Sequence, residues 1–566
     1  MAESILVAVA WPYANGEPHL GHVAGTFLPA DIFARYHRLR GNRVLMVSGS
    51  DMHGTPTALT AEREGVEPVV IANRYHELFV ETIDRFKFQF DLYTTTATDN
   101  HAEVTQSIFT NLQRNGYLYE KTESMPYCLE EQRFLSDRFV VGTCPICSFE
   151  KAGGDQCDNC GNTLDAADLV GIRCVTDGSV PEFRDTEHFV FELSAFAEQL
   201  EEWVNSKEFF RPQVRNMSLS MIREGLPDRA ITRDITWGVP VPPHVEGYEN
   251  KRIYVWFEAV IGYLSASVEW AKIQGDEDAW KAWWHDPEAK SFYFVGKDNT
   301  PFHAIFWPAM IMAGAGDPAL NLPHDVPANE YLNYEGGAFS KSRNWGINAR
   351  DALNRYDSDA LRYYMSATMP ETSDSDFNWR SFLARNNDEL VATLGNFIHR
   401  VLSMTQRNFD GVVPERGDQD DADRDALSAC ASAMIEVASQ IEERHFREGL
   451  RLIMALAQTG NRYLDTQAPW KTAKTDMDRT GTTLAIGIEI ASTLRTLMHP
   501  YLPDGAAKLH NSLAASGELS DTGWSNPTPS AGTQLPKPSP IFTKLDETMV
   551  EEELARHESP DPGEAV

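Results

Sequence analysis

The feature that most constrains the fold is a strand–helix alternation that stops partway along the chain and then resumes. Residues 1–115 alternate apolar strands with amphipathic helices, residues 116–234 lose this rhythm, and the rhythm returns after residue 235. Strands joined by helices form parallel sheets, which bind ligands at the carboxyl ends of their strands. The sequence therefore predicts one parallel sheet divided by an inserted module. The expected strands are 5–10, 44–48, 252–263 (running into a helix) and 291–295, with helices at about 21–39 and 301–313.

The last third of the chain has a different pattern. Apolar residues recur there at three- and four-residue spacing, which is typical of amphipathic helices that pack as a bundle. From about residue 517 the composition shifts to serine, proline, glycine and threonine, which indicates an irregular segment. Residues 546–566 are acidic, and we expect them to be frayed. The expected helices are 388–406, 425–440, 446–467 and 482–498.

Four of the seven cysteines lie close together, at Cys144, Cys147, Cys157 and Cys160. Two Cys-x-x-Cys pairs supply four thiolates, which is the ligand set of a tetrahedral structural zinc site. Reduced thiols without a metal, or a redox pair, are the alternatives. Cys128 and Cys174 each stand alone and complete no second four-cysteine site, so we expect one zinc ion.

The chain is strongly acidic, with a formal net charge of −33. Taken alone, this argues against a nucleic-acid partner, because phosphate binding needs Lys and Arg, although it does not exclude a local groove. An acidic surface also keeps a protein soluble in a salt-rich cell, so we expect a halophilic source. No apolar run approaches the ~20 residues of a membrane span, and the N-terminus lacks a basic secretory start. We therefore expect a cytoplasmic protein that does not contact membranes.

Two short motifs together predict a phosphate site. Pro18-His19-Leu20-Gly21-His22 follows the first strand and opens a helix, whose free N–H groups and dipole attract phosphate. Phe339-Ser340-Lys341-Ser342 follows Gly336-Gly337 and places a cation on a glycine-hinged loop. Each motif alone is weak, since surface histidines and solvated polar loops are common. Their order, one after each half of the sheet, makes the pair specific.

These motifs resemble the HIGH and KMSKS signatures of class I aminoacyl-tRNA synthetases. The second departs at its first position, where Ala338 replaces Lys, so the resemblance leaves Lys341 as the main cation on the departing pyrophosphate. Further stretches, in order and to about residue 545, resemble the methionyl-tRNA synthetase family, in an archaeal-like form. They are Pro12–Gly16, Asp51–Pro56, Val255–Ala259, Gly262-Tyr263, Gly296–Asp298 with Phe302-His303, and Phe306–Ala309.

The resemblance implies a methionine–tRNA ligase that uses ATP with Mg²⁺, forms methionyl-adenylate and charges tRNA(Met). Within such a site, Asp51 would hold the substrate ammonium group and aromatic faces would contact the thioether. For any single Trp or Tyr, ordinary core packing is the commoner role. The resemblance assigns catalysis to His19, His22 and Lys341; ATP binding to these and Gly21, Gly296 and Asp298; methionine binding to Tyr13, Asp51, Trp256, Ala259, Tyr263 and His303; and anticodon contacts to Asn396, Arg400 and Trp470.

The same resemblance divides the chain and leaves two alternatives open. One is another class I synthetase, for Leu, Ile, Val or Cys, although the insertion is shorter than the editing domain that the Ile, Val and Leu enzymes house there. The other is a non-catalytic tRNA-binding relative, and a monomer is expected in each case. The expected segments are 1–115 and 235–325 (the two halves of a Rossmann-like catalytic domain), 116–234 (zinc-knuckle insertion), 326–381 (the KMSKS-loop and stem-contact region), 382–545 (helical anticodon-binding domain) and 546–566 (acidic tail).

Overall fold

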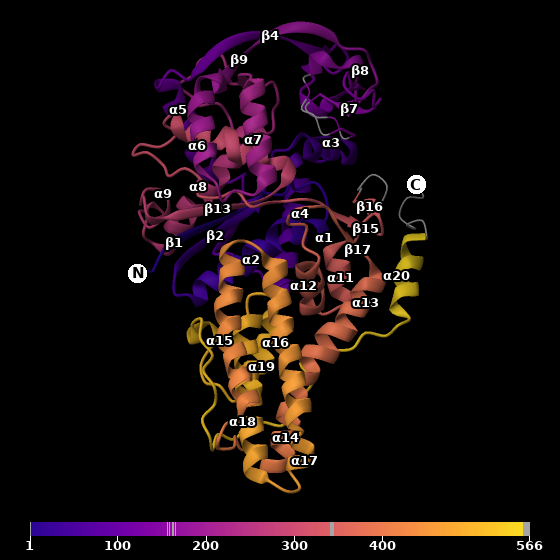
Figure 1. Cartoon of the computed structure of the whole chain (residues 1–566). Coiled ribbons are helices and arrows are strands. Elements are labelled where there is room, and N and C mark those ends of the chain that lie inside the picture. The colour runs from indigo at the N-terminus through magenta and orange to yellow at the C-terminus, as the bar shows by residue number, and fades with distance from the viewer. Residues whose placement is uncertain are drawn as a thin grey trace.

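The computed structural model describes residues 2–154, 157, 159–160, 164, 166–339 and 345–558. Over these ranges an α/β body carries a protruding insertion at one end and a helical bundle at the other (Figure 1). The predicted fold class, a Rossmann-like parallel sheet split by an insertion and followed by a helical bundle, is confirmed. None of the helices in the described ranges is long and apolar enough to cross a membrane.

The central sheet has five strands in the order β14-β13-β1-β2-β3, and every neighbouring pair is parallel. The chain leaves β1 toward β2 on one side and returns to β13 on the other. The carboxyl edge between β1 and β13 is therefore a topological switch point, where open α/β sheets bind ligands. The strands are β1 (Ser4–Val9), β2 (Arg43–Ser50), β3 (Leu92–Thr95), β13 (Lys290–Gly296) and β14 (Ala328–Asn329).

Both faces of this sheet are covered, because alternate residues of a strand point to opposite sides. On β1, Ile5, Val7 and Val9 belong to one core, which includes helix α2 (Leu28–Leu39). Leu6 and Ala8 belong to a second core, which includes α5 (Asp99–Arg114) and α8 (Val255–Gln274). A central strand buried on both sides requires the continuous apolar run that the sequence has there.

One strand prediction needs correction, and two strands of the central sheet were missed. Arg252–Ile253 forms a short strand, β12, but it pairs with β11 (Thr232–Arg233) in a separate antiparallel ribbon and not with the central sheet. The helix expected after it is α8. The edge strands β3 and β14 escaped prediction because they span four and two residues, too few for a periodic pattern.

The insertion is built on a long antiparallel pair, β4 (Leu118–Cys128) and β9 (Glu182–Phe191). At its far end a small sheet of β6 (Val140–Thr143), β7 (Ala152–Gly153) and β8 (Val170–Cys174) encloses a cysteine-rich core. This knuckle module packs against α3 (Thr55–Glu64), which follows β2 in the catalytic body (Figure 1).

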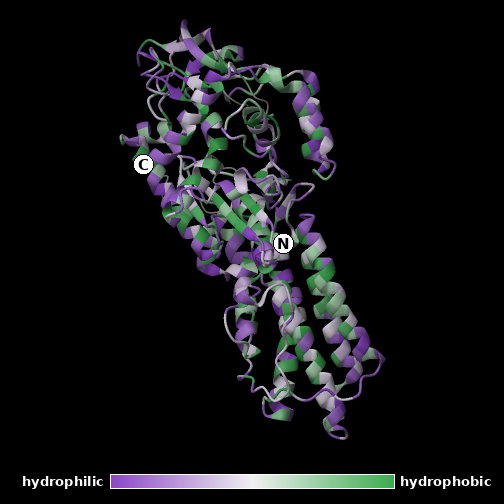
Figure 2. Ribbon diagram, turned by 90° about the vertical axis from the view of Figure 1, so that its left-hand side faces the viewer, coloured by the Kyte–Doolittle hydropathy of each residue, from purple (hydrophilic) through white to green (hydrophobic). Residues whose placement is uncertain are grey.

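Within the described residues, the bundle contains four long helices that overlap the predicted ones, together with two shorter helices that were not predicted. Along these helices hydrophobic and hydrophilic residues alternate, as expected for amphipathic helices that share a core (Figure 2). They are α14 (Asn396–Phe409), α15 (Asp421–Glu442), α16 (Phe446–Gln467), α17 (Pro469–Thr472), α18 (Met477–Met498) and α19 (Pro503–Ser512).

The acidic tail differs from the frayed segment that its composition predicts. Met549–Glu558 forms a helix, α20, beside α13 (Trp379–Ala384) (Figure 1). Glu553 is 1% exposed, and its carboxylate accepts hydrogen bonds from Tyr356 Oη at 2.7 Å and Arg355 Nε at 2.5 Å. The paired Glu553 carboxylate and the buried side chains of Met549 and Val550 hold this segment against the body.

Candidate active site and accessory sites

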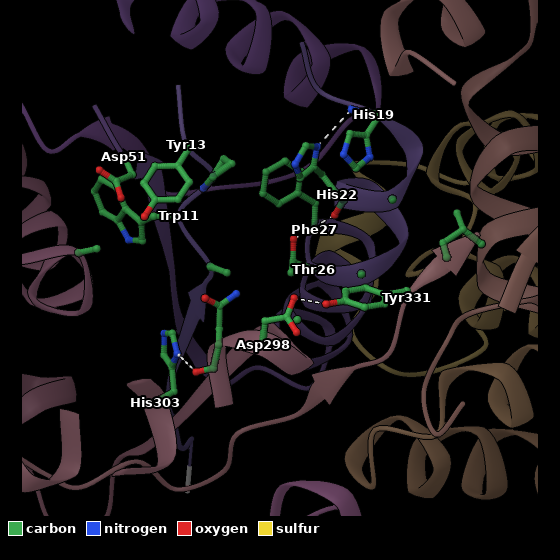
Figure 3. A pocket seen from close by; sticks show the side chains of 18 of the residues that line it. Trp11, Tyr13, His19, His22, Thr26, Phe27, Asp51, Asp298, His303 and Tyr331 are labelled. Carbon is green, nitrogen blue, oxygen red and sulfur yellow. Dashed lines mark hydrogen bonds between the residues drawn. The ribbon is translucent and has the colours of Figure 1, made fainter. Parts of the chain in front are cut away.

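A cavity of about 440 Å³ opens at the switch point between β1 and β13 (Figure 3). Eleven residues assigned to ATP or methionine by the resemblance line this one cavity, although they come from five separate stretches of sequence. Lys341, with Ser340 and Ser342, lies outside the described residues. The eleven are Tyr13, His19, Gly21, His22, Asp51, Trp256, Ala259, Tyr263, Gly296, Asp298 and His303.

The two histidines of the first motif stand at the start of the first long helix. His19 caps α1 (Leu20–His22), which continues through a π-helical segment (Val23–Phe27) into α2. Their rings stack with centroids 3.7 Å apart, and His22 Nδ1 accepts a hydrogen bond from the His19 backbone N–H at 3.2 Å. A Cβ at Gly21 would lie 2.8 Å from His19 Nδ1, so only glycine leaves room for this ring. The stacked pair therefore faces the cavity at the start of this helix.

Residues on either side of the loop 340–344 contact the first motif. The Phe339 ring stacks on His19 with centroids 4.9 Å apart and lines the cavity. Beyond the loop, Leu20 N–H donates to the Ile347 carbonyl at 3.1 Å, and Ala349 N–H donates to the Pro18 carbonyl at 2.9 Å. The chain thus enters and leaves residues 340–344 next to the histidine motif.

Asp51 lies at the end of β2 and is 3% exposed. Its backbone is held on both sides, since Asp51 N–H donates to the Pro12 carbonyl and the Asp51 carbonyl accepts from Ala14 N–H, each at 2.8 Å. Burial, together with the nearby Glu258 carboxylate, raises the pKa of Asp51 to about 8. A cation arriving at this carboxyl group would lower its pKa and form a charge-assisted pair.

Tyr263 and His303 form a fixed hydrogen-bonded pair in the wall of the cavity. His303 Nδ1 lies 2.8 Å from the Asn299 carbonyl, to which it donates, so Nε2 accepts from Tyr263 Oη at 2.7 Å. Burial lowers the pKa of His303 to about 4, and burial raises the pKa of Tyr263, so both groups are neutral near pH 7. The Tyr263 hydroxyl therefore uses its one hydrogen-bond donor on His303 and has none left for a ligand.

The remaining wall is aromatic. Trp256 stacks on Phe302 with ring centroids 4.1 Å apart, and Tyr13 meets Trp256 edge-on at 5.8 Å. Trp11 meets Tyr263 edge-on at 6.4 Å. Contacts of this kind favour a polarisable thioether, whose sulfur interacts well with ring edges and faces.

The opposite wall comes from the end of β13. Gly296 ends the strand, and the Asp298 carboxylate accepts a hydrogen bond from Tyr331 Oη (Figure 3). Beside it, Lys297 Nζ bonds Glu330 at 2.7 Å and Asp374 at 3.0 Å. Lys297 is thus engaged by two carboxylates in this state.

Sequence reasoning missed a buried charge network behind Asp51. Glu258 is fully buried, with one carboxylate oxygen 2.9 Å from His53 Nδ1 and the other 3.6 Å from His101 Nε2. Burial alone would raise the pKa of Glu258, but His53 and His101 outweigh it and hold the pKa below its usual range. The signal was visible as an acidic residue within the apolar helix α8, because a buried charge must be paired.

The four clustered cysteines come together in the knuckle module. Their sulfurs lie within 4.8 Å of one another, with Cys144–Cys160 at 3.9 Å and Cys147–Cys157 at 3.6 Å. Four sulfurs around one zinc ion, each about 2.3 Å from the metal, stand about 3.8 Å apart at tetrahedral angles. These residues therefore fit a zinc ion.

The three predicted anticodon residues also meet, at the tip of the bundle far from the cavity (Figure 1). Arg400, on α14, places its guanidinium 5.3 Å from the ring centroid of Trp470, on α17. Arg400 also bonds Asp465 at 2.7 Å, and both Arg400 and Asn396 reach Asn461, at 3.3 and 3.5 Å. Trp470 is 41% exposed, unlike a core residue of the same type.

A parallel sheet whose switch point joins a His-Leu-Gly-His helix start to Phe339 of the second motif has the features of a class I aminoacyl-tRNA synthetase. Family models agree: residues 5–402 match tRNA synthetases class I (M), and residues 413–560 match the anticodon binding domain of methionyl tRNA ligase. The chain belongs to the methionyl-tRNA synthetase family.

Individual relatives support the same assignment. A methionine–tRNA ligase of Dehalococcoides mccartyi is 52% identical over 98% of this chain and 100% of its own length, and one of Roseiflexus sp. is 49% identical over 98% and 99%. The structure of Mycobacterium tuberculosis methionyl-tRNA synthetase bound by methionyl-adenylate superposes with a TM-score of 0.79 and 25% identity, covering 96% of this chain and 100% of that one. These relatives are bacterial and give no support to an archaeal-like form.

Proposed function

We propose that the cavity between β1 and β13 activates methionine with ATP, and that the product is then transferred to the 3′ end of tRNA(Met). The observation that carries this proposal is the convergence of the histidine pair, Asp51 and the Tyr263–His303 pair on one cavity. ATP arrives with Mg²⁺ as its counter-ion. The reaction joins the methionine carboxylate to the α-phosphate and releases pyrophosphate.

Methionine recognition follows from the wall chemistry. Asp51 binds the ammonium group, and burial makes that pair stronger than it would be in water. Tyr13, Trp256 and Ala259 contact the side chain, and the Tyr263–His303 pair closes its far end. Because the Tyr263 hydroxyl donates its hydrogen bond to His303 and both groups are neutral, this end of the cavity offers a rigid, neutral surface to the thioether.

Phosphate handling relies on positioning and charge stabilisation. His19 and His22 face the polyphosphate, and Gly21 keeps the backbone open to it. Gly296 and Asp298 contact the nucleoside part. Lys341 follows Phe339 by two residues, and Phe339 stacks on His19, so we assign stabilisation of the charge on the leaving pyrophosphate to Lys341.

We further propose a structural zinc ion at Cys144, Cys147, Cys157 and Cys160, because four thiolates leave no ligand position open for chemistry. When bound, zinc would crosslink the two turns of the knuckle module, and that module buttresses α3. Asp51 lies at the foot of α3, so metal loss should weaken methionine binding as well as the module itself.

For tRNA, we propose that Trp470 stacks on an unpaired anticodon base while Asn396 and Arg400 contact base edges. Arg400 is bound to Asp465 in the free chain and would exchange that carboxylate for nucleic acid.

We propose that the protein is a cytoplasmic monomer.

The net charge of −33 leads us to propose that the protein works in high salt. Salt near 1 M shortens the Debye length to ~3 Å and so screens acidic surfaces from each other and from tRNA. Charging activity and thermal stability, measured from low to molar salt, should both rise. Full activity and stability without added salt would contradict salt adaptation.

The decisive test of the activity is amino-acid-dependent ATP–pyrophosphate exchange with each of the twenty amino acids, followed by charging of tRNA(Met). Exchange with methionine alone, and charging of that tRNA, are expected. Exchange with Leu, Ile, Val or Cys instead would assign a different substrate. No exchange with any amino acid, in a folded protein that binds tRNA, would indicate a non-catalytic relative.

A further inference from the structure

Two cysteines that stand alone in the sequence meet in the knuckle module. Cys128 ends β4 and Cys174 ends β8, and both are buried, with 0% and 2% exposure. Ligand atoms of Cys128, Glu131 and Cys174 all lie within 4.8 Å of one another. We propose that Cys128, Glu131, Cys174 and Asp177 form a second site for a divalent transition metal, with two sulfur and two oxygen ligands.

The turn after Cys174 has the backbone of a metal knuckle. In the four-cysteine site, Cys144 N–H donates to the Phe149 carbonyl at 2.9 Å and Ser148 N–H donates to the Cys144 carbonyl at 3.0 Å. In the second turn, Cys174 N–H donates to the Ser179 carbonyl at 2.9 Å and Gly178 N–H donates to the Cys174 carbonyl at 3.0 Å. Ser148 and Gly178 both have positive φ, at 62° and 74°. The two turns match residue for residue, and Asp177 occupies the position of Cys147.

The turn after Cys128 shares the local features of the first knuckle. Its fifth residue, Gln132, has a φ of 54°, as Ser148 and Gly178 have positive φ at the same position. The Glu131 N–H, three residues after Cys128, donates to Cys128 Sγ at 3.5 Å, whereas in the first knuckle the Ile146 N–H, two residues after Cys144, donates to Cys144 Sγ at 3.4 Å. Glu131 stands three residues after its cysteine, which is the spacing of a second knuckle ligand. A non-glycine residue with positive φ is uncommon, and Gln132 and Ser148 have it at the same position of their turns.

The distances between the ligand atoms suit one ion. Cys128 Sγ lies 3.1 Å from Asp177 Oδ2, and Cys174 Sγ lies 3.7 Å from Glu131 Oε2. A tetrahedral ion with metal–sulfur bonds of about 2.3 Å and metal–oxygen bonds of about 2.0 Å separates sulfur from oxygen by about 3.5 Å. The observed values lie on either side of this distance, so small side-chain rotations complete the site.

Both carboxylates are held from outside the cluster. Arg133 Nε bonds Glu131 Oε2 at 2.6 Å, and Ser179 N–H bonds Asp177 Oδ1 at 2.8 Å. Outer hydrogen bonds of this kind orient ligands in metal sites, and the arginine also offsets part of the negative charge of two thiolates and two carboxylates. Counting only cysteines led to the expectation of one zinc ion, whereas this turn geometry adds a second ion.

The test is the zinc content of the purified full-length chain, measured by elemental analysis after dialysis against a weak chelator. Two zinc ions per chain are expected for the parent protein. Cys174→Ser and Glu131→Gln should each lose one ion, and Cys147→Ser should lose the other. Glu130→Gln, at the exposed neighbouring carboxylate, and Cys430→Ser, in the bundle, are matched controls that should keep both ions.

X-ray absorption at the zinc edge provides a reading that does not depend on a variant folding. A four-sulfur site together with a two-sulfur, two-oxygen site averages about three sulfurs and one oxygen per zinc, with distances of about 2.3 and 2.0 Å. One zinc ion per chain in a pure sulfur environment would overturn the proposal and would leave thiol–carboxylate hydrogen bonds as the link in this knuckle. Because no activity is measured, this result stands apart from the proposed function.

Discussion

The two ends of the molecule recognise their ligands in opposite ways. The cavity at the switch point has buried polar groups that are already paired with protein, as in the Tyr263–His303 hydrogen bond. The tip of the bundle presents Trp470, 41% exposed, and an arginine that is held by an exposed aspartate. A small substrate can be enclosed in a rigid site, whereas a polymer has to be met on an open surface with side chains that can exchange partners.

This contrast has a consequence for mutations. A change in the cavity should affect adenylate formation and, through it, tRNA charging. A change at the tip should affect charging alone, because the tip touches neither methionine nor ATP. The comparison fails if the two ends respond alike.

The largest effect is expected from His22→Ala. This change removes one of the two stacked imidazole rings and leaves the His19 backbone N–H without its acceptor. Loss of one preorganised group at a developing charge typically costs about 10²–10³ in rate. Exchange and charging should both fall by this factor, with an unchanged melting temperature to show that the fold persists. His244→Ala, at an exposed position, serves as the control. Loss of charging alone would remove His22 from the activation step.

Trp470→Ala is expected to give the next largest effect. Base stacking on an aromatic side chain contributes about 1–3 kcal/mol, so the efficiency of tRNA charging should fall by about 5- to 150-fold. Methionine-dependent exchange should stay at the parental level. Ile435→Ala, which removes another exposed hydrophobic side chain from the bundle, is the matched control and should leave both activities unchanged. Equal losses in exchange and charging would contradict the separation of the two ends.

The two ends also differ in how far the sequence could predict them. Asn396 and Arg400 are four residues apart on one helix, so their common face follows from helical periodicity. The cavity joins Tyr13 to His303, and only the resemblance, not any local pattern, brought those positions together. Glu258 and its histidines were missed because their pairing depends on tertiary packing of α8 against the end of β2. Likewise, Glu131 and Asp177 looked like ordinary surface acids until the turns that carry them could be compared.

A third effect should appear in the pH dependence of methionine use. The pKa of Asp51 is raised to about 8 by burial and by Glu258, so below that pH the free enzyme carries mostly the neutral acid, which cannot pair with an ammonium group. The value of kcat/KM for methionine reports the free enzyme and should fall about tenfold from pH 7 to pH 6. Asp51→Asn should lower kcat/KM and flatten this slope. A slope that persists in the variant would assign the titration to another group, such as His53.

The smallest effect is expected from Tyr263→Phe, and it examines how rigid the cavity has to be. The change removes the proton that His303 Nε2 accepts and leaves a buried acceptor unpaired, while the ring and its contact with Trp11 remain. A neutral hydrogen bond contributes about 0.5–1.5 kcal/mol, so kcat/KM for methionine in exchange should fall by about 2- to 13-fold. Since burial keeps His303 neutral, lowering the pH to 6 should not rescue the loss. If the pair mainly fixes the shape of the cavity, exchange with leucine should rise relative to methionine, because a loosened wall no longer excludes a branched side chain. An unchanged ratio of leucine-dependent to methionine-dependent exchange would show instead that the aromatic wall alone determines selectivity. The fixed hydrogen-bonded pair of the cavity would then matter less for recognition than its contrast with the open tip of the bundle implies.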